Sequence, residues 1–312
     1  MENLILSVNV VLPIFLAIVL GYFLKSIGML PESVQKPLNS LCFRVFLPIY
    51  LFENLYTTDL NAAFDARLVG FALSGVVVLW FALMLLVPRI EPADSRRGVM
   101  IQGMFRCNFA VFGLPVALAL CGADRMGPTA LLVGLVVPSV NVMSVIALET
   151  FRGGKPSATK MLRGIASNPL ILGSAAGALA NIAGLTLPTG VMRSVNSLGS
   201  VATPLSLVAL GASFSFGSVR EHVRQLSIVV ASKLALNSLV MVTVAVLLGF
   251  RQEQLVPLLI IFAAPTAVSS YPMAEEMGGD GPLAASIVVF TSAVSILTIF
   301  LWVFALKSFG LI

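Results

Sequence analysis

Prolines recur at a fixed distance along this chain of 312 residues. Four of them have a partner 156 or 157 residues later, and the pairs are Pro13 with Pro169, Pro31 with Pro188, Pro48 with Pro204, and Pro115 with Pro272. Glycines share this spacing at Gly21 with Gly177, Gly28 with Gly184, and Gly122 with Gly279. A spacing that recurs in this way predicts one structural unit that occurs twice. We therefore expect a first unit over residues 1–155 and a second over residues 156–312.

Both units have the composition of membrane-embedded chain. Hydrophobic residues make up 58% of the sequence and charged residues 11%, whereas a soluble domain carries about 25% charged residues. Polar breaks separate ten apolar runs that are long enough to cross a bilayer as helices. The runs cover residues 4–24, 35–56, 66–88, 97–121, 128–149, 161–183, 190–214, 224–249, 253–278 and 282–307. Five spans per unit is an odd number, so the predicted fold is an all-α membrane protein with two inverted five-helix repeats.

Basic residues give these spans an orientation. With the N-terminus outside, eleven basic residues fall in cytoplasmic connections, namely Lys25, Lys36, Arg89, Arg96, Arg97, Arg152, Lys155, Lys160, Arg163, Arg220 and Arg224. Only five fall on the outer side, namely Arg67, Arg125, Arg193, Arg251 and Lys307. Cytoplasmic loops of membrane proteins carry the excess of Lys and Arg. We therefore expect a multi-pass protein of the inner (plasma) membrane with both termini outside.

The fourth and ninth runs contain residues that interrupt helices. The fourth reads "MFRCNFAVFGLPVALALCG", and Gly113 and Pro115 weaken helix in its middle. A simple proline kink is the alternative for this run. The ninth reads "FAAPTAVSSYPMAEEMGGD", in which Pro265 and Pro272 flank Ser269, Ser270 and Tyr271. Irregular backbone at membrane depth is tolerated only where protein or a wet cavity satisfies it. Two breaks related by an inverted repeat are expected to cross near the membrane midplane.

The predicted crossing favours a negatively charged ligand. The second half-helices, expected to start near Pro115 and Pro272, would direct their N-terminal amides toward the crossing, and such amides attract anions. Three cations, Arg44, Arg106 and Lys233, lie within predicted spans. Each either lies at a functional site or is accommodated by snorkelling or by pairing with an acid or a carbonyl.

Two further polar residues near the breaks, Asn108 and Glu275, are candidates for the functional site. Arg106 lies two residues from Asn108, which places both at the fourth-span break. Asn108 either binds substrate or only caps the first half-helix. Glu275 lies one turn after Pro272 and, with Arg44 and Lys233, is a candidate for coupling or gating.

Signatures of other function classes are missing from the sequence. His222 is the only histidine, so neither a Ser-His-Asp triad nor a histidine metal site can be assembled. The Gly-rich segments lack a phosphate-binding pattern. Basic residues are scattered rather than clustered, which is not typical of nucleic-acid binding. We expect no catalytic residues, no metal, no cofactor and no nucleic-acid partner.

Five segments resemble motifs of the auxin efflux carrier family. They are "FRVFLPIYLF" at 43–52, "RCNFAVFGLP" at 106–115, "SNPLILGSAAG" at 167–177, "TPLSLVALGASF" at 203–214 and "AAPTAVSSYPMA" at 263–274. The family includes plant PIN-FORMED carriers and bacterial malate or malonate permeases, and the resemblance covers essentially the whole chain. It implies a fold like that of the bile-acid sodium symporters. The resemblance further implies that spans one, two, six and seven form a scaffold and that spans three to five and eight to ten form a transport domain.

The resemblance also implies roles for individual residues. Asn108 matches the crossover asparagine and Pro115 the proline of the fourth span, while Pro265 to Tyr271 match the ninth-span crossover. Plant members have a second asparagine in the ninth span, which residues 256–280 lack, so Ser269 or Ser270 would supply that polar contact. The short connection at 150–160 resembles the bacterial members.

These observations lead to one main functional hypothesis and two alternatives. We expect a secondary active transporter or facilitator of small organic acid anions, malate- or malonate-like or auxin-like, that works by elevator-type alternating access. The alternatives are a sodium-coupled symporter of the bile-acid type and a membrane sensor that does not transport. The expected partners are the anion, membrane lipid and, as an open hypothesis, a second copy of the chain. The coupling ion and the direction of transport stay open.

Overall fold

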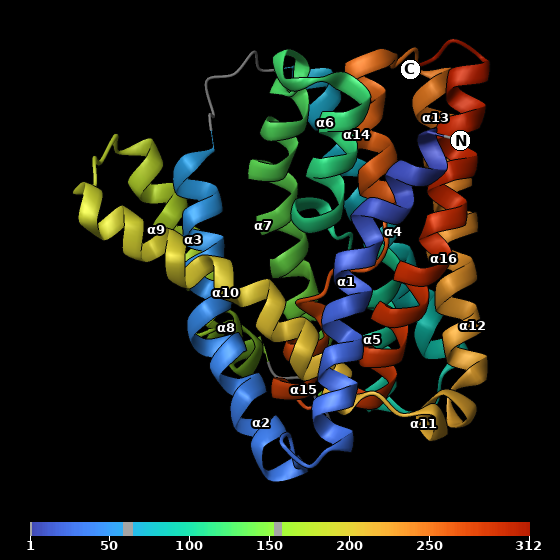
Figure 1. Ribbon diagram of the computed structural model, residues 1–312. Helices are drawn as coiled ribbons and strands as arrows, with labels where there is room; N and C mark the ends of the chain where they lie inside the picture. Colours follow the sequence, from blue (N-terminus) through green and yellow to red (C-terminus); the bar gives the residue numbers. More distant parts are fainter. Residues whose placement is uncertain (1, 59–64, 153–157) are drawn as a thin grey trace.

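The computed structural model describes residues 2–58, 65–152 and 158–312, and these residues form helices joined by short connections (Figure 1). Within the described ranges, five helices are long and apolar enough to cross a membrane, namely Ala66–Ile90, Gly127–Thr150, Thr189–Ser213, Val223–Leu247 and Gly281–Ser308. The chain is therefore an all-helical membrane protein. All ten apolar runs contain helix, although length and hydropathy identify five of them as spans.

The first half of the chain contains α1 (Glu2–Ser26), α2 (Glu32–Leu41), η1 (Cys42–Phe46), α3 (Leu47–Thr57), α4 (Ala66–Ile90), α5 (Asp94–Phe105), η2 (Phe109–Gly113), α6 (Leu114–Cys121), η3 (Ala123–Arg125) and α7 (Gly127–Thr150). The second half contains α8 (Ala158–Ala166), α9 (Pro169–Ile182), α10 (Thr189–Ser213), α11 (Phe216–Glu221), α12 (Val223–Ala231), η4 (Ser232–Asn237), α13 (Ser238–Leu247), α14 (Gln252–Ala263), α15 (Ser270–Glu276) and α16 (Gly281–Ser308). The segments η1, η2 and η4 are π-helical turns.

One group of helices packs through glycines. Helix α3 packs against α9 and α10, and α10 packs along α1. Gly21 of α1 lies directly against the backbone of Val208 in α10, and Gly177 of α9 lies against the backbone of Phe52 in α3. A side chain at either glycine would overlap the facing carbonyl, so glycine is required for these close approaches. Gly177 follows Gly21 by 156 residues, and Val208 follows Phe52 by the same number. The two contacts are therefore related by the repeat spacing of the sequence.

A second group of helices surrounds the two interrupted segments. Helix α5 packs against α4 and α7, α14 packs against α6, α7 and α13, and α16 packs against α5, α12 and α15. Figure 1 shows α3, α8 and α9 at one side of the molecule, away from α12 and α16. The start of α1 and the end of α16 lie at the same end of the molecule.

Helix is interrupted within the fourth and the ninth apolar run. Residues 106–108 separate α5 from η2, and residues 264–269 separate α14 from α15. The backbone N–H of Asn108 donates to the carbonyl oxygen of Pro265 at 2.8 Å, so the two irregular segments bond to each other. The buried backbone at the crossing thereby satisfies part of its own hydrogen-bonding requirement.

The position of the first interruption differs from the prediction. The second half-helix of this segment begins at Phe109 rather than near Pro115. Pro115 lies six residues further on, at the start of α6, which continues directly from the π-helical turn η2. A further difference concerns the run 161–183, which consists of α8 and α9 instead of one helix. The side chain of Asn168 accepts from Leu170 N at 3.0 Å and caps α9 after this break.

Candidate functional site

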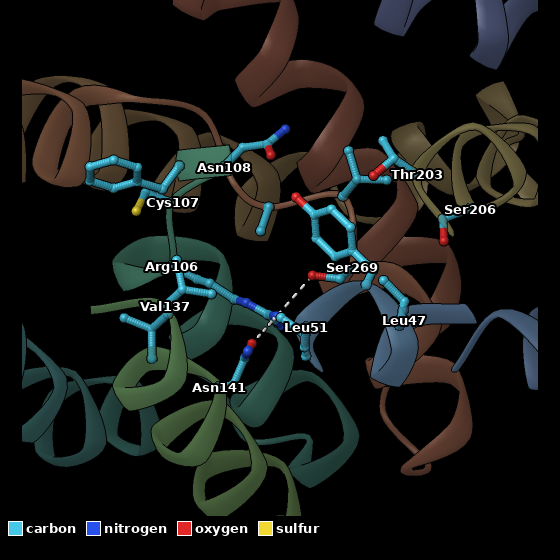
Figure 2. A pocket seen from close by; sticks show the side chains of 15 residues that line it. Leu47, Leu51, Arg106, Cys107, Asn108, Val137, Asn141, Thr203, Ser206 and Ser269 are labelled. Atoms are coloured by element: carbon cyan, nitrogen blue, oxygen red, sulfur yellow. Dashed lines mark hydrogen bonds between the residues drawn. The ribbon is translucent and has the colours of Figure 1, made fainter. Parts of the chain in front are cut away.

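A cavity lies where the two interrupted segments meet (Figure 2). Side chains from α3, α7, α10 and both irregular segments line it, and they are Leu47, Tyr50, Leu51, Arg106, Cys107, Asn108, Phe109, Val137, Val140, Asn141, Thr203, Ser206, Ala267, Val268 and Ser269. About 50 Å³ of this space admits the centre of a water molecule. The lining combines apolar walls with a few polar groups, which is the usual composition of a small-molecule site.

Arg106 is the charged residue of this cavity. Its side chain is buried, and Nη2 donates to Asn141 Oδ1 and, at 2.8 Å, to Ser269 Oγ. Nη1 lies 3.0 Å from the sulfur of Met273, a weak acceptor. Figure 2 shows the guanidinium reaching between Asn141 and Ser269. None of the ion pairs in the described part of the chain includes Arg106.

Two amide side chains of the cavity lining have unused donors. Asn108 and Asn141 are both buried, and the Nδ2 atom of each lacks a hydrogen-bond partner. A buried donor without a partner costs about 1–3 kcal/mol, which a ligand that accepts from it would recover. The guanidinium and the two amides together form a donor-rich site. A carboxylate has only acceptor oxygens when it is ionised and matches this set.

The amides at the start of the ninth-span half-helix, which were predicted to attract an anion, bond to carbonyls of the chain itself. The N–H groups of Ser270 and Tyr271 donate to the carbonyls of Ala267 and Val268 at 3.0 and 3.2 Å. These amides are therefore already used within the irregular segment. The formal positive charge of the cavity lining is carried by the Arg106 side chain.

Other predicted residues shape the crossing without lining the cavity. Gly113 faces Ile260 of α14, and an added Cβ would overlap the isoleucine side chain. Pro265 accepts the Asn108 bond, and Ser270 accepts a 3.0 Å bond from Gln102 Nε2 through its carbonyl. Pro115 is exposed, away from this cavity.

The remaining ninth-span candidates face a second cavity near the ends of α1 and α15. Tyr271 and Glu275 line it together with Lys25, Glu32 and Lys36. The Tyr271 hydroxyl is hydrogen-bonded to Ser213 of α10. Pro272 is buried beside this cavity and accepts a bond from Asn39 Nδ2 at 3.4 Å.

Two of the predicted cations lie outside the central cavity. The Arg44 side chain is 69% exposed and pairs with Glu276 at 3.2 Å. Lys233 is buried, and its Nζ donates to the carbonyl of Ile261 at 3.3 Å. Of the three cations within predicted spans, the structure thus brings only Arg106 into the cavity.

Sequence reasoning missed several lining residues. The sequence did not predict four polar residues of the lining, namely Tyr50 of α3, Asn141 of α7, and Thr203 and Ser206 of α10. Asn141 carries a recognisable signal, because an amide in the middle of an apolar span requires a partner. The other three lie in helices whose composition gives no sign of the cavity.

Comparison with known proteins gives the family of this chain. The sequence matches the family described as "Membrane transport protein" over residues 6–160 and 155–303. It is 24% identical over 307 residues to a protein named "Uncharacterized transporter" of Methanothermobacter thermautotrophicus, with 95% of this chain and 97% of the relative covered. It is 23% identical over 299 residues, 93% of each chain, to a protein of Rhizobium meliloti named "Putative malonate transporter". The protein is a membrane transporter rather than an enzyme, and it belongs to the membrane transport protein family, that of the auxin efflux carriers.

Proposed function

We propose that this protein is a secondary transporter of small organic acid anions and that its central cavity binds the carboxylate. The observation that carries the proposal is the buried Arg106 guanidinium, which bonds to neutral acceptors and to no carboxylate of the described chain. A buried cation without a counter-ion is costly, and an anionic ligand supplies the missing charge. Asn108 and Asn141 provide further donors at the same place.

The substrate class is that of short carboxylates. The space that admits the centre of a water molecule is about 50 Å³, and a cavity needs about 10–15 Å³ to hold one water. The space therefore suits a few waters or one small acid such as malonate. The relative from Rhizobium meliloti, whose name refers to malonate, supports the same class.

The proposed mechanism is an elevator movement of one helix group along the other. The ten apolar runs act as ten spans in two inverted repeats, residues 1–155 and 156–312. The helices of the first, second, sixth and seventh runs, α1, α2, α3, α8, α9 and α10, form the scaffold, and the helices of the other runs, around the two breaks, form the moving transport domain. The repeat-related contacts of Gly21 and Gly177 support this division, since both lie inside the proposed scaffold. Polar contacts between the groups, such as Arg44 with Glu276, can break and re-form at low cost.

Counterflow of labelled organic acids in proteoliposomes tests the function. Preloaded malonate should accelerate uptake of labelled malonate, and an equal load of a neutral or cationic solute should not. Arg106→Gln should weaken malonate binding by about 10- to 100-fold, the scale of about 1.5–3 kcal/mol for charged hydrogen bonds. Arg106→Lys should keep part of the affinity, because the charge remains while the two-pronged geometry is lost.

A comparison of malonate with acetate makes this test specific. Arg106→Gln should reduce affinity more for the dicarboxylate than for the monocarboxylate, whereas the control Arg125→Gln, at a helix connection outside the cavity, should change neither. Equal losses for both anions would assign Arg106 a structural role. Preferred transport of neutral or cationic solutes would overturn the substrate class.

A further inference from the structure

A π-helical turn presents two buried polar side chains to the crossing. Turn η4 packs against α5, α14 and α16. It carries Lys233 and Asn237, which are four residues apart and are 1% and 6% exposed. π-Turns inside helices occur often at functional sites because they redirect side chains that an α-helix would place elsewhere.

These two side chains bond to the ends of the interrupted helices. Asn237 Nδ2 donates to Met104 O in the last turn of α5 at 3.0 Å. Lys233 Nζ donates to Ile261 O in the last turn of α14 at 3.3 Å. The last carbonyls of a helix lack partners within it and carry the negative end of its dipole. The Lys233 ammonium therefore lies at an electronegative helix end inside the protein.

The ion pairs of the described chain do not include Lys233. The carbonyl end of α14 is thus the group that compensates this buried charge. In secondary transporters with inverted repeats, carbonyls at the ends of half-helices are the groups that coordinate coupling cations. A second cation bound to the same carbonyls would lie close to the ammonium and be repelled by it inside the protein. Lys233 and a bound metal cation cannot share this helix end.

We propose that Lys233 occupies, as a permanent cation, the position of a coupling cation, so that anion transport by this protein requires neither Na⁺ nor K⁺. This inference rests on the transporter function proposed above and specifies its ion dependence. Lys233 acts as a positioning residue, since it fixes the end of α14 beside the cavity and does not line the cavity itself.

Thermal unfolding of the purified protein in detergent tests the inference without any substrate. The wild-type unfolding temperature should be equal in NaCl, KCl and choline chloride of the same ionic strength. Lys233→Ala removes the three terminal methylene groups and the ammonium, and should unfold at a lower temperature. n-Propylammonium has the same atoms as the part that was removed, and by binding the folded variant it should raise the unfolding temperature by several degrees. A ligand present at about 100 times its dissociation constant stabilises the folded state by about 2.7 kcal/mol.

Asn237→Ala is the matched control, because it removes the neutral cap from the same turn. It should lower the unfolding temperature without any gain from n-propylammonium. Stabilisation of the wild type by Na⁺ or K⁺ would overturn the inference. The inference would also be overturned if n-propylammonium raised the unfolding temperature of Lys233→Ala no more than that of Asn237→Ala. If Lys233→Ala does not fold, the wild-type comparison of salts still decides.

Counterflow of malonate provides the second measurement. Wild-type rates in choline medium free of Na⁺ and K⁺ should stay within about twofold of the rates in NaCl, whereas loss of about tenfold or more would overturn the inference. Absence of malonate counterflow in every medium would refute the proposed function, and the unfolding experiment would then decide on Lys233 alone.

Discussion

At the scale of single residues, the central cavity is organised by Arg106 and by the neutral acceptors around it. Asn141 Oδ1 and Ser269 Oγ hold the guanidinium in place without neutralising its charge. A carboxylate side chain at either position would neutralise the Arg106 charge permanently, and an anionic ligand would then gain no free energy by pairing with it. The sequence identified Arg106 and Asn108 because polar residues beside a break are conspicuous, whereas Asn141 is 33 residues further along and is related to them only by the fold.

Asn141→Asp tests whether this missing neutralisation matters. The new carboxylate would lie beside Arg106, pair with it and replace the unpartnered Nδ2 by an acceptor. We expect malonate affinity to fall by about tenfold or more, with thermal stability maintained, because the internal carboxylate competes with the ligand. Titration of malonate binding by the purified variant measures the loss. Asn141→Leu, which leaves the cation unpaired, should lose less affinity, and the reverse order would show that Asn141 acts only through its own contact with the ligand.

At the scale of elements, the crossing depends on how closely η2 approaches α14. Gly113 faces Ile260, and a Cβ at this position would overlap the isoleucine Cγ2 atom. Pro115, which the sequence marked as the break, lies instead in the first turn of α6. Helix already resumes at Phe109, so Pro115 marks the junction of η2 with α6 and not the break itself. The stop at 106–108 was harder to predict because it is stabilised by a bond to Pro265, a residue of the other repeat.

Gly113→Ala should therefore weaken the crossing. We expect a loss of about 1–3 kcal/mol in unfolding free energy, the usual cost of overpacking, with reduced transport. Ile260→Ala in the same chain should recover part of both losses, because it makes room for the added methyl group. Denaturant unfolding and counterflow measure the two effects. Gly127→Ala has open space at its Cβ and serves as the control, for which a change within about 0.5 kcal/mol is expected. A Gly113→Ala variant as stable and active as the wild type would show that the close approach is dispensable.

At the scale of the whole molecule, the repeat spacing of the prolines and glycines in the sequence recurs in the structure, both in contacts between helices and in the turns that follow them. Gly28 and Gly184, one repeat apart, both adopt positive φ after α1 and α9. Gly122 and Gly278 both have a φ of 77°. The structural counterpart of Gly122 is therefore Gly278, one residue before the Gly279 that the sequence spacing paired with it. This repeated glycine spacing could be predicted from the sequence because glycine has few substitutes where φ is positive. The relation of the spans to the two sides of the membrane depends instead on the bilayer, for which the basic residues are the available signal.

Cysteine labelling in intact cells tests both the inversion and the orientation. Met29 and Leu185 are 65% and 58% exposed, and they follow the related turns at Gly28 and Gly184. Two single-cysteine chains, Met29→Cys and Leu185→Cys, can be made after replacing Cys42, Cys107 and Cys121, which are buried. Because repeat-related positions of an inverted pair lie on opposite sides, a membrane-impermeant maleimide should label one of them only. The excess of basic residues in the predicted cytoplasmic connections places Leu185→Cys outside and Met29→Cys inside. Labelling of Met29→Cys alone would reverse the orientation and keep the repeat, whereas labelling of both from outside would refute the inverted arrangement.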